Sequence, residues 1–163
     1  MAVTVSPANT KALGIDLLLS TTDRRHELGL EVLGNDGNTY KYARAGAAIT
    51  QYDALKVDYA ESVNDVDPTT ATLQVVVGIA PIAAGDNEYF WYICKGSITA
   101  NVDAGVTAGA QLGSMASAGR LVALDAGAAY AQAEARAILA AAAGVGLQAM
   151  ANAAANRAVI RIN

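Results

Sequence analysis

Short runs of alternating apolar and polar residues dominate the first hundred positions of the chain. Residues 28–33 and 39–44 each follow a two-residue period, and the loop 34–38 between them contains Asp-Gly. Such a pair of runs is typical of a β-hairpin, because glycine accepts the positive φ angle that the turn requires. The pattern therefore predicts a hairpin over residues 28–44.

Further strands are expected along the chain. Residues 88–95 are apolar on both faces, which indicates a central strand or one that another chain covers. Residues 97–102 are expected to pair with this strand through a turn at Gly96. Residues 64–70 are polar and contain Pro68, so a loop is predicted there. The other predicted strands are residues 53–58, 73–80, 120–124, 147–150 and 158–162.

The two ends of the chain differ from this middle region. Residues 1–27 lack a sustained period and are interpreted as an N-terminal arm, which leaves residues 28–163 as one domain. Residues 126–143 are dominated by alanine with larger side chains at helical spacing, so one short helix is predicted there. Many short strands with glycine-rich turns favour a mainly β fold, here a small β-barrel that carries this arm and this helix.

The arm is too apolar for a solvated tail. Its side chains either pack on their own domain or dock onto a partner or a neighbouring subunit, and the sequence alone leaves both interpretations open. The residues singled out for such contacts are Leu13, Ile15, Leu17, Leu18, Leu19, Arg24 and Arg25.

Composition narrows the classes of partner. The 163 residues include 11 basic and 15 acidic side chains, and only 16% are charged, against about 25% in ordinary soluble domains. The formal charge of −4 disfavours binding to the phosphates of a nucleic acid. Apolar stretches are too short to span a bilayer, and no basic leader precedes them, so neither a membrane partner nor a secretory signal is expected. A chain so poor in charge must cover its surface with small residues or bury part of it in an assembly.

Residues suited to catalysis are scarce. His26 is the one histidine, and its basic, polar surroundings indicate a solvated or salt-bridged side chain. Cys94 is the one cysteine and is expected to be a buried, unreactive thiol. Residues 144–149 match the G-x-G-x-x-A dinucleotide fingerprint by letter, but no β-branched strand precedes them. We therefore expect no enzymatic activity, no catalytic residue and no cofactor.

Two acidic loops offer oxygen ligands of the kind that Ca²⁺ prefers. These are residues 35–38 and residues 65–67. Neither has the spacing of an EF-hand, and turn chemistry explains both without an ion. No metal site is expected.

A series of short motifs runs in order from residue 27 to the end of the chain. They are Glu-Leu-Gly at 27–29, Gly-Asn-Asp-Gly-Asn-Thr-Tyr at 34–40, Ala-Gly-Ala-Ala-Ile at 45–49, Gln-Tyr-Asp-Ala-Leu-Lys at 51–56, Val-Gly-Ile-Ala at 77–80, the aromatic run at 89–93, Gly-Ser-Ile-Thr-Ala-Asn-Val at 96–102, Gly-Ala-Gln-Leu at 109–112, Ser-Ala-Gly-Arg-Leu at 117–121, Gly-Leu-Gln-Ala-Met at 146–150 and Ala-Val-Ile-Arg-Ile at 158–162. In this order they resemble the bacteriophage head decoration proteins, also called capsid cement or stabilisation proteins.

The resemblance implies a fold and a role. Members of the family are non-enzymatic β-tulip barrels that form homotrimers on the outer surface of the phage head, after synthesis in the host cytoplasm. They clamp adjacent subunits of the major capsid protein, and an N-terminal arm reaches onto the capsid. On this interpretation the arm residues named above contact the capsid, and Tyr89, Trp91 and Tyr92 lie at a subunit interface or in the core.

A different class of function competes with this one. In a carbohydrate-binding or adhesion module of a phage or bacterial surface structure, Tyr89, Trp91 and Tyr92 would stack on sugars from an open face. Such a module is expected to be monomeric, whereas a capsid clamp should trimerise or bind only assembled shells.

Overall fold

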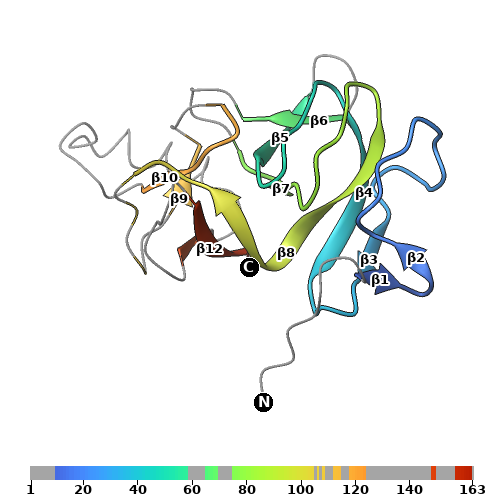
Figure 1. The fold of residues 1–163 in the computed structure, drawn as a ribbon, viewed down its shortest axis with the longest axis horizontal. Helices are drawn as coiled ribbons and strands as arrows, with labels where there is room; N and C mark the ends of the chain where they lie inside the picture. The colour runs from blue at the N-terminus through green and yellow to red at the C-terminus, as the bar shows by residue number, and fades with distance from the viewer. Residues whose placement is uncertain are drawn as a thin grey trace.

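The structure is a computed structural model that describes residues 10–58, 65–69, 75–104, 106, 108, 112–114, 118–123, 148–149 and 157–162. Figure 1 shows its strands, and the described residues contain no helix. The strands are β1 (Lys11–Ala12), β2 (Ile15–Asp16), β3 (Glu31–Leu33), β4 (Thr39–Ala45), β5 (Ala54–Asp58), β6 (Asp65–Pro68), β7 (Gly78–Ile79), β8 (Tyr89–Asn101), β9 (Leu112–Gly113), β10 (Val122–Ala123), β11 (Gln148–Ala149) and β12 (Arg157–Ile162).

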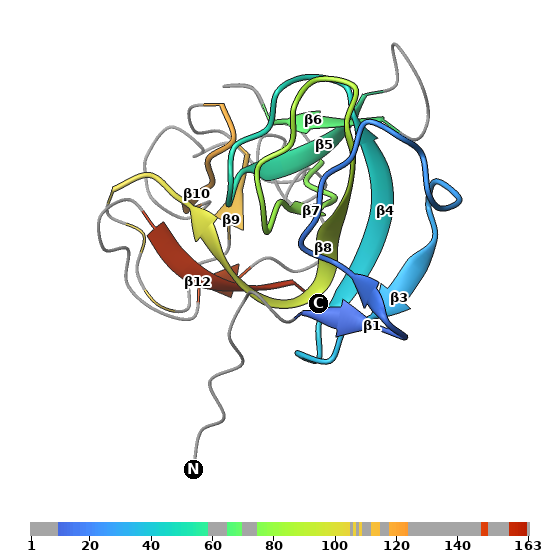
Figure 2. The same cartoon turned by 45° about the vertical axis from the view of Figure 1, so that its right-hand side comes forward.

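Strand β8 organises the main sheet. Its first half pairs antiparallel with β4, where Tyr42 lies opposite Trp91, and its second half pairs antiparallel with β12, where Ile160 lies opposite Ile98. The eight-stranded sheet has the order β11-β12-β8-β7-β5-β6-β4-β3, with β8 and β4 as an additional pair. Figures 1 and 2 show β8 running from the side of the molecule that holds β4 to the side that holds β12.

The two faces of β8 enter two separate hydrophobic cores, because successive side chains of a strand point to opposite faces. Trp91 and Ile93 join Tyr40 and Tyr42 in the larger core. Phe90 and Tyr92 belong to the smaller core. The aromatic strand is therefore central, which is one of the two arrangements that its apolar pattern on both faces indicated.

The predicted closed barrel is wrong. Among the described residues, β3 and β11 are the ends of the eight-stranded order, and the pairs β1–β2 and β9–β10 form separate two-stranded sheets. The reason lies in β8, which pairs with β4 and β7 near its start and with β12 near its end. One strand shared between two groups of neighbours splays the sheet into two parts (Figure 2).

The C-terminal helix predicted over the Ala-rich residues 126–143 lies outside the described residues. The described residues themselves contain no helix. In the part of the chain that the structure describes, no helix has the length and apolarity needed to cross a membrane.

About half of the strands were predicted from the sequence. The hairpin over residues 28–44 is confirmed by β3 and β4, and strands are confirmed within residues 53–58, 120–124, 147–150 and 158–162. The short strands β1, β2 and β9 were not predicted. Residues 65–68 were expected in a loop but form β6, which pairs with both β5 and β4. Residues 88–95 and 97–102 were expected as two paired strands but form the single strand β8, and of residues 73–80 only Gly78–Ile79 is assigned to a strand.

Candidate functional site

Residues 10–27 cross the face of the sheet that β4 and β8 form. Thr21 and Tyr89 exchange two backbone hydrogen bonds of 2.7 and 2.9 Å. The Leu17 side chain is completely buried in the larger core. This part of the predicted arm therefore packs on its own domain.

The hairpin β1–β2 is held firmly against the turn between β3 and β4. The Lys11 amide donates to Asn35 Oδ1 at 3.1 Å, and the Asn35 amide donates to the Lys11 carbonyl at 2.9 Å. Leu13 and Gly14 form the two-residue loop of the hairpin, with φ angles of 49° and 84°. Both values are left-handed, as a type I′ turn requires. The Leu13 side chain is fully exposed at its tip.

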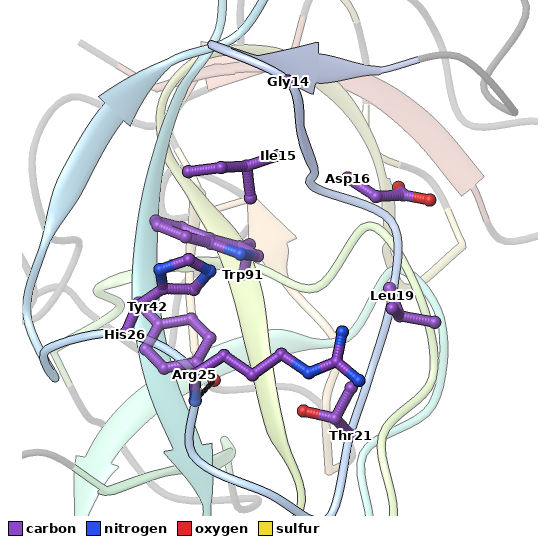
Figure 3. A pocket seen from close by; sticks show the side chains of 9 residues that line it. All are labelled: Gly14, Ile15, Asp16, Leu19, Thr21, Arg25, His26, Tyr42 and Trp91. Carbon is purple, nitrogen blue, oxygen red and sulfur yellow. Dashed lines mark hydrogen bonds between the residues drawn. The ribbon is translucent and has the colours of Figure 1, made fainter.

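A pocket of about 380 Å³ lies between this N-terminal segment and the sheet. Figure 3 shows Trp91 and Tyr42 behind it, with Ile15 and Leu19 from the N-terminal segment. The centroids of the Tyr42 and Trp91 rings are 4.9 Å apart. The Tyr42 and Trp91 rings, which come from the neighbouring strands β4 and β8, thus form an aromatic wall at the back of the pocket.

His26 packs against that wall. Its ring lies edge-on to Tyr42 at 5.1 Å and at 5.2 Å from Trp91. The expectation of a solvated or salt-bridged histidine is therefore wrong, since the side chain is half-buried against rings and no ion pair to a described residue involves it. No carboxylate among the described residues orients the imidazole as a general base would require.

Hydrogen bonds made by the two arginines fix the backbone course of the N-terminal segment. The Arg25 amide donates to the Tyr42 hydroxyl at 3.1 Å, and Arg24 Nε donates to the His26 carbonyl at 3.0 Å. The Arg24–Glu27 ion pair, at 3.8 Å, is solvent-exposed and so contributes little stability. In Figure 3 the exposed Arg25 side chain extends across the mouth of the pocket toward Thr21.

The structure divides the seven predicted arm residues into two groups. Leu17 is buried, and Ile15 and Leu18 are half-buried. The exposed members are Leu13, Leu19, Arg24 and Arg25. The side chains of this second group are the most accessible of the seven to a neighbouring molecule.

The three predicted aromatic residues do not share an open face. Trp91 is 2% exposed in the larger core, and Tyr92 is 4% exposed in the smaller core on the opposite side of β8. Tyr89 is half-buried and stacks on Tyr42 with a centroid distance of 6.2 Å. These rings stabilise the sheet and do not form a platform for sugars.

Exposed apolar residues on β3 and immediately before it were missed by the sequence reasoning. Leu33 is 69% exposed and Leu30 is also exposed. The signal was present in the sequence, because Leu33 shares the outward face of the strand with Glu31. An apolar residue beside a charged one on the same face of a strand marks a surface position.

The remaining candidates for chemistry have structural roles. Asp36 accepts hydrogen bonds from the Asn38 amide, the Asn38 side chain and the Tyr40 hydroxyl, so the acidic loop at 35–38 is explained as a turn. Burial raises the pKa of the half-buried Cys94 thiol, which keeps it protonated and weakly nucleophilic. No cluster of three potential metal ligands exists among the described residues.

Comparison with known proteins gives one informative likeness. No protein-family model matches the sequence. No curated protein matches it either. Among solved structures, the crystal structure of the N base of head fiber gp8.5 from bacteriophage phi29 is similar, with a TM-score of 0.52 and 12% sequence identity over 76% of this chain and 92% of that one. At this identity the likeness is one of fold.

Proposed function

We propose that the chain is a structural protein of a bacteriophage head, bound to the outer surface of the shell. The observation that carries the proposal is the fold shared with a head fiber base, which extends over 92% of that base. The order of motifs that resembles head decoration proteins agrees with it. In its finer form, the proposal is a homotrimer that clamps adjacent subunits of the major capsid protein.

Exposed leucines supply a surface for such contacts. We call Leu13, Leu30 and Leu33 the leucine edge; all three are exposed. The hydrogen bonds between Lys11 and Asn35 place the hairpin that carries Leu13 beside the turn that follows Leu33. Figures 1 and 2 both show β1 next to β3. Exposed apolar groups gathered on neighbouring elements favour a protein contact.

Other features support a role in binding to other proteins and not in catalysis. The sequence has one histidine and one cysteine, and the structure packs the histidine against Tyr42 and Trp91. The competing sugar-binding role for Tyr89, Trp91 and Tyr92 loses its basis, because Trp91 and Tyr92 are buried on opposite faces of β8. The net charge of −4 supports a partner other than nucleic acid.

Co-sedimentation tests the proposal. Purified protein is mixed with expanded heads of its phage that lack it, and with unexpanded precursor heads as the matched control. We expect saturable binding to the expanded heads and a trimer in size-exclusion chromatography with light scattering. A monomer that stays in the supernatant with both kinds of head would contradict the proposal.

A further inference from the structure

A second pocket, of about 490 Å³, has none of the three residues of the leucine edge in its lining. It lies among the loop residues 51–52, the segment at Ile82 and the second half of β8 at Ser97 and Thr99. The N-terminal segment at Leu18 and the β3–β4 turn at Asp36 and Asn38 also contribute to its lining. This volume falls in the range of small-molecule sites, which is about 300–1,000 Å³. Its lining combines aliphatic side chains with hydroxyl and amide groups.

Tyr52 at this pocket has a strained backbone. Its φ angle is 72°, in the left-handed region that residues other than glycine rarely adopt. The surrounding structure fixes this conformation from both sides, since the Tyr52 amide donates to the Ala80 carbonyl at 2.7 Å and the Asn101 amide donates to the Tyr52 carbonyl at 2.9 Å. Strain that neighbouring groups enforce in this way is typical of ligand-binding positions.

The loop around Tyr52 is rigid. The buried Asp53 carboxylate accepts hydrogen bonds from the Thr50 amide at 2.9 Å, the Thr50 hydroxyl at 2.6 Å and Asn101 Nδ2 at 3.0 Å. The guanidinium of Arg157 lies over the Tyr52 ring, 5.0 Å from its centroid. The half-exposed ring is therefore held in one place before any ligand arrives, and such preorganisation favours binding.

Hydrogen bonds within the protein orient the polar groups of the pocket. Asn38 donates from its side chain to Asp36, and its Oδ1 accepts from the Ser97 amide at 2.8 Å. Asp36 already accepts three hydrogen bonds from Asn38 and Tyr40, which stabilise its carboxylate and occupy it within the protein. The hydroxyls of Ser97 and Thr99 lie on one face of β8 and bond to no described residue.

We infer that this pocket binds a neutral saccharide, such as a hexose unit of a bacterial surface glycan. A pyranose ring offers an apolar C–H face to the Tyr52 ring and hydroxyl groups to Ser97, Thr99 and the free oxygen of Gln51. A purely apolar ligand would strip water from these hydroxyls without replacing their hydrogen bonds. An anion would meet the Asp36 carboxylate. The inference goes beyond the proposed head contact and does not depend on it.

Saturation-transfer NMR and glycan arrays provide the test, using glucose, galactose and N-acetylglucosamine, their oligomers, and acidic glycans for comparison. Tyr52→Gly removes the ring while glycine accepts the positive φ, so the fold is retained. Thr99→Val removes one hydroxyl at a half-buried strand position, and Thr39→Val makes the same change outside the pocket. Circular dichroism verifies that each variant is folded.

We expect a neutral saccharide to bind the parent protein and Thr39→Val equally. Thr99→Val should bind it about fivefold to tenfold more weakly, and Tyr52→Gly should lose binding. Absence of binding at ~10 mM monosaccharide, a level that detects even very weak sites, would overturn the inference. Three other results would also overturn the inference. The pocket variants could bind the saccharide as well as the parent protein does, or the protein could bind acidic glycans alone. Tyr52→Gly could also lose binding to heads while the parent protein binds no glycan.

Discussion

Leu13 combines two features that the isolated fold does not need. Its φ of 49° places a branched side chain in the left-handed region, where asparagine and glycine are preferred, and the side chain is fully exposed. The left-handed conformation costs about 1–2 kcal/mol for an ordinary residue. The side chain packs against none of the described residues, and the proposed head contact would bury it.

Replacing Leu13 by asparagine separates the stability of the fold from the contact. Asparagine suits the type I′ turn, so Leu13→Asn should leave the free energy of unfolding unchanged or raise it by up to about 1 kcal/mol. Binding to heads should weaken about tenfold or more, because the buried leucine contributes roughly 1.5–3 kcal/mol to a contact. Thermal unfolding and co-sedimentation measure the two effects.

Leu13→Met is the matched control, since it keeps an apolar side chain and the same backbone strain. It should bind heads nearly as well as the parent. Equal binding by the parent, Leu13→Met and Leu13→Asn would show that the hairpin tip makes no contact.

Two buried tyrosines predict how stability depends on pH. Burial raises the pKa values of Tyr40 and Tyr92 above the ordinary value of 10.0, and the hydrogen bond to Asp36 adds to the effect at Tyr40. Unfolded tyrosines ionise near pH 10, while these two hold their protons in the folded state. The free energy of unfolding should therefore be unaffected by them at neutral pH and fall as the pH rises above 10.

Urea denaturation between pH 8 and 11 measures this slope. Tyr92→Phe should reduce the slope by about 1.4 kcal/mol per pH unit above pH 10, the contribution of one proton. A variant whose stability falls as steeply as that of the parent would show that Tyr92 ionises normally in the folded state.

At the scale of elements, Gly96 allows β8 to pass the β3–β4 turn. Its φ is 121°, and a Cβ atom there would overlap Asn38. Gly96→Ala should lower the free energy of unfolding by about 2–4 kcal/mol, from backbone strain and steric overlap together. Chemical denaturation measures the change.

Gly37→Ala is the control, because its φ is also positive, at 83°, but nothing lies within 4 Å of the added carbon. Gly37→Ala should lower the free energy of unfolding by only about 1 kcal/mol, which is the contribution of the left-handed backbone conformation without steric overlap. If both substitutions cost the same, the close approach at Asn38 would not be what requires glycine at position 96.

Elements with local signals were predictable from the sequence. The hairpin of β3 and β4 follows from an alternating pattern and an Asp-Gly turn whose Gly37 has the positive φ expected of it. Strand β12 follows from a compact apolar run. Each signal lies within about ten residues of the structure that it specifies.

Features that depend on distant residues were not predictable. A glycine with positive φ ends a strand in one context and bends it in another, so Gly96 alone could not distinguish a hairpin from the single strand β8. Barrel closure failed for a related reason, since the register of β8 with β4 and β12 joins residues 45 or more positions apart. The polar strand β6 gains its hydrogen bonds from β4 and β5, which no local pattern reveals.

The candidate sites were predictable only in part. An apolar N-terminal segment indicated contacts, but whether Leu17 or Leu13 faced the solvent depended on the turn at residues 13–14. The saccharide pocket brings together residues between positions 10 and 99. Its central residue, Tyr52, has a positive φ angle, which no pattern in the sequence predicts.

At the scale of the whole molecule, the head contact and the saccharide pocket use different residues. The leucine edge lies on the β1–β2 hairpin and on residues 30–33, whereas Tyr52 and Thr99 lie on the 51–52 loop and β8. Leu13→Asn should therefore leave glycan binding unchanged, and Tyr52→Gly should leave co-sedimentation with heads unchanged. Additivity of the two substitutions in the double variant, in both assays, checks this independence.

Cryo-electron microscopy of expanded heads saturated with the protein is the most direct test of the central claim. The account predicts added density on the outer surface of the shell that fits this fold, with the β1–β2 hairpin directed toward the major capsid protein. Heads whose outer surface shows no added density after incubation with a folded, saturating protein would contradict it.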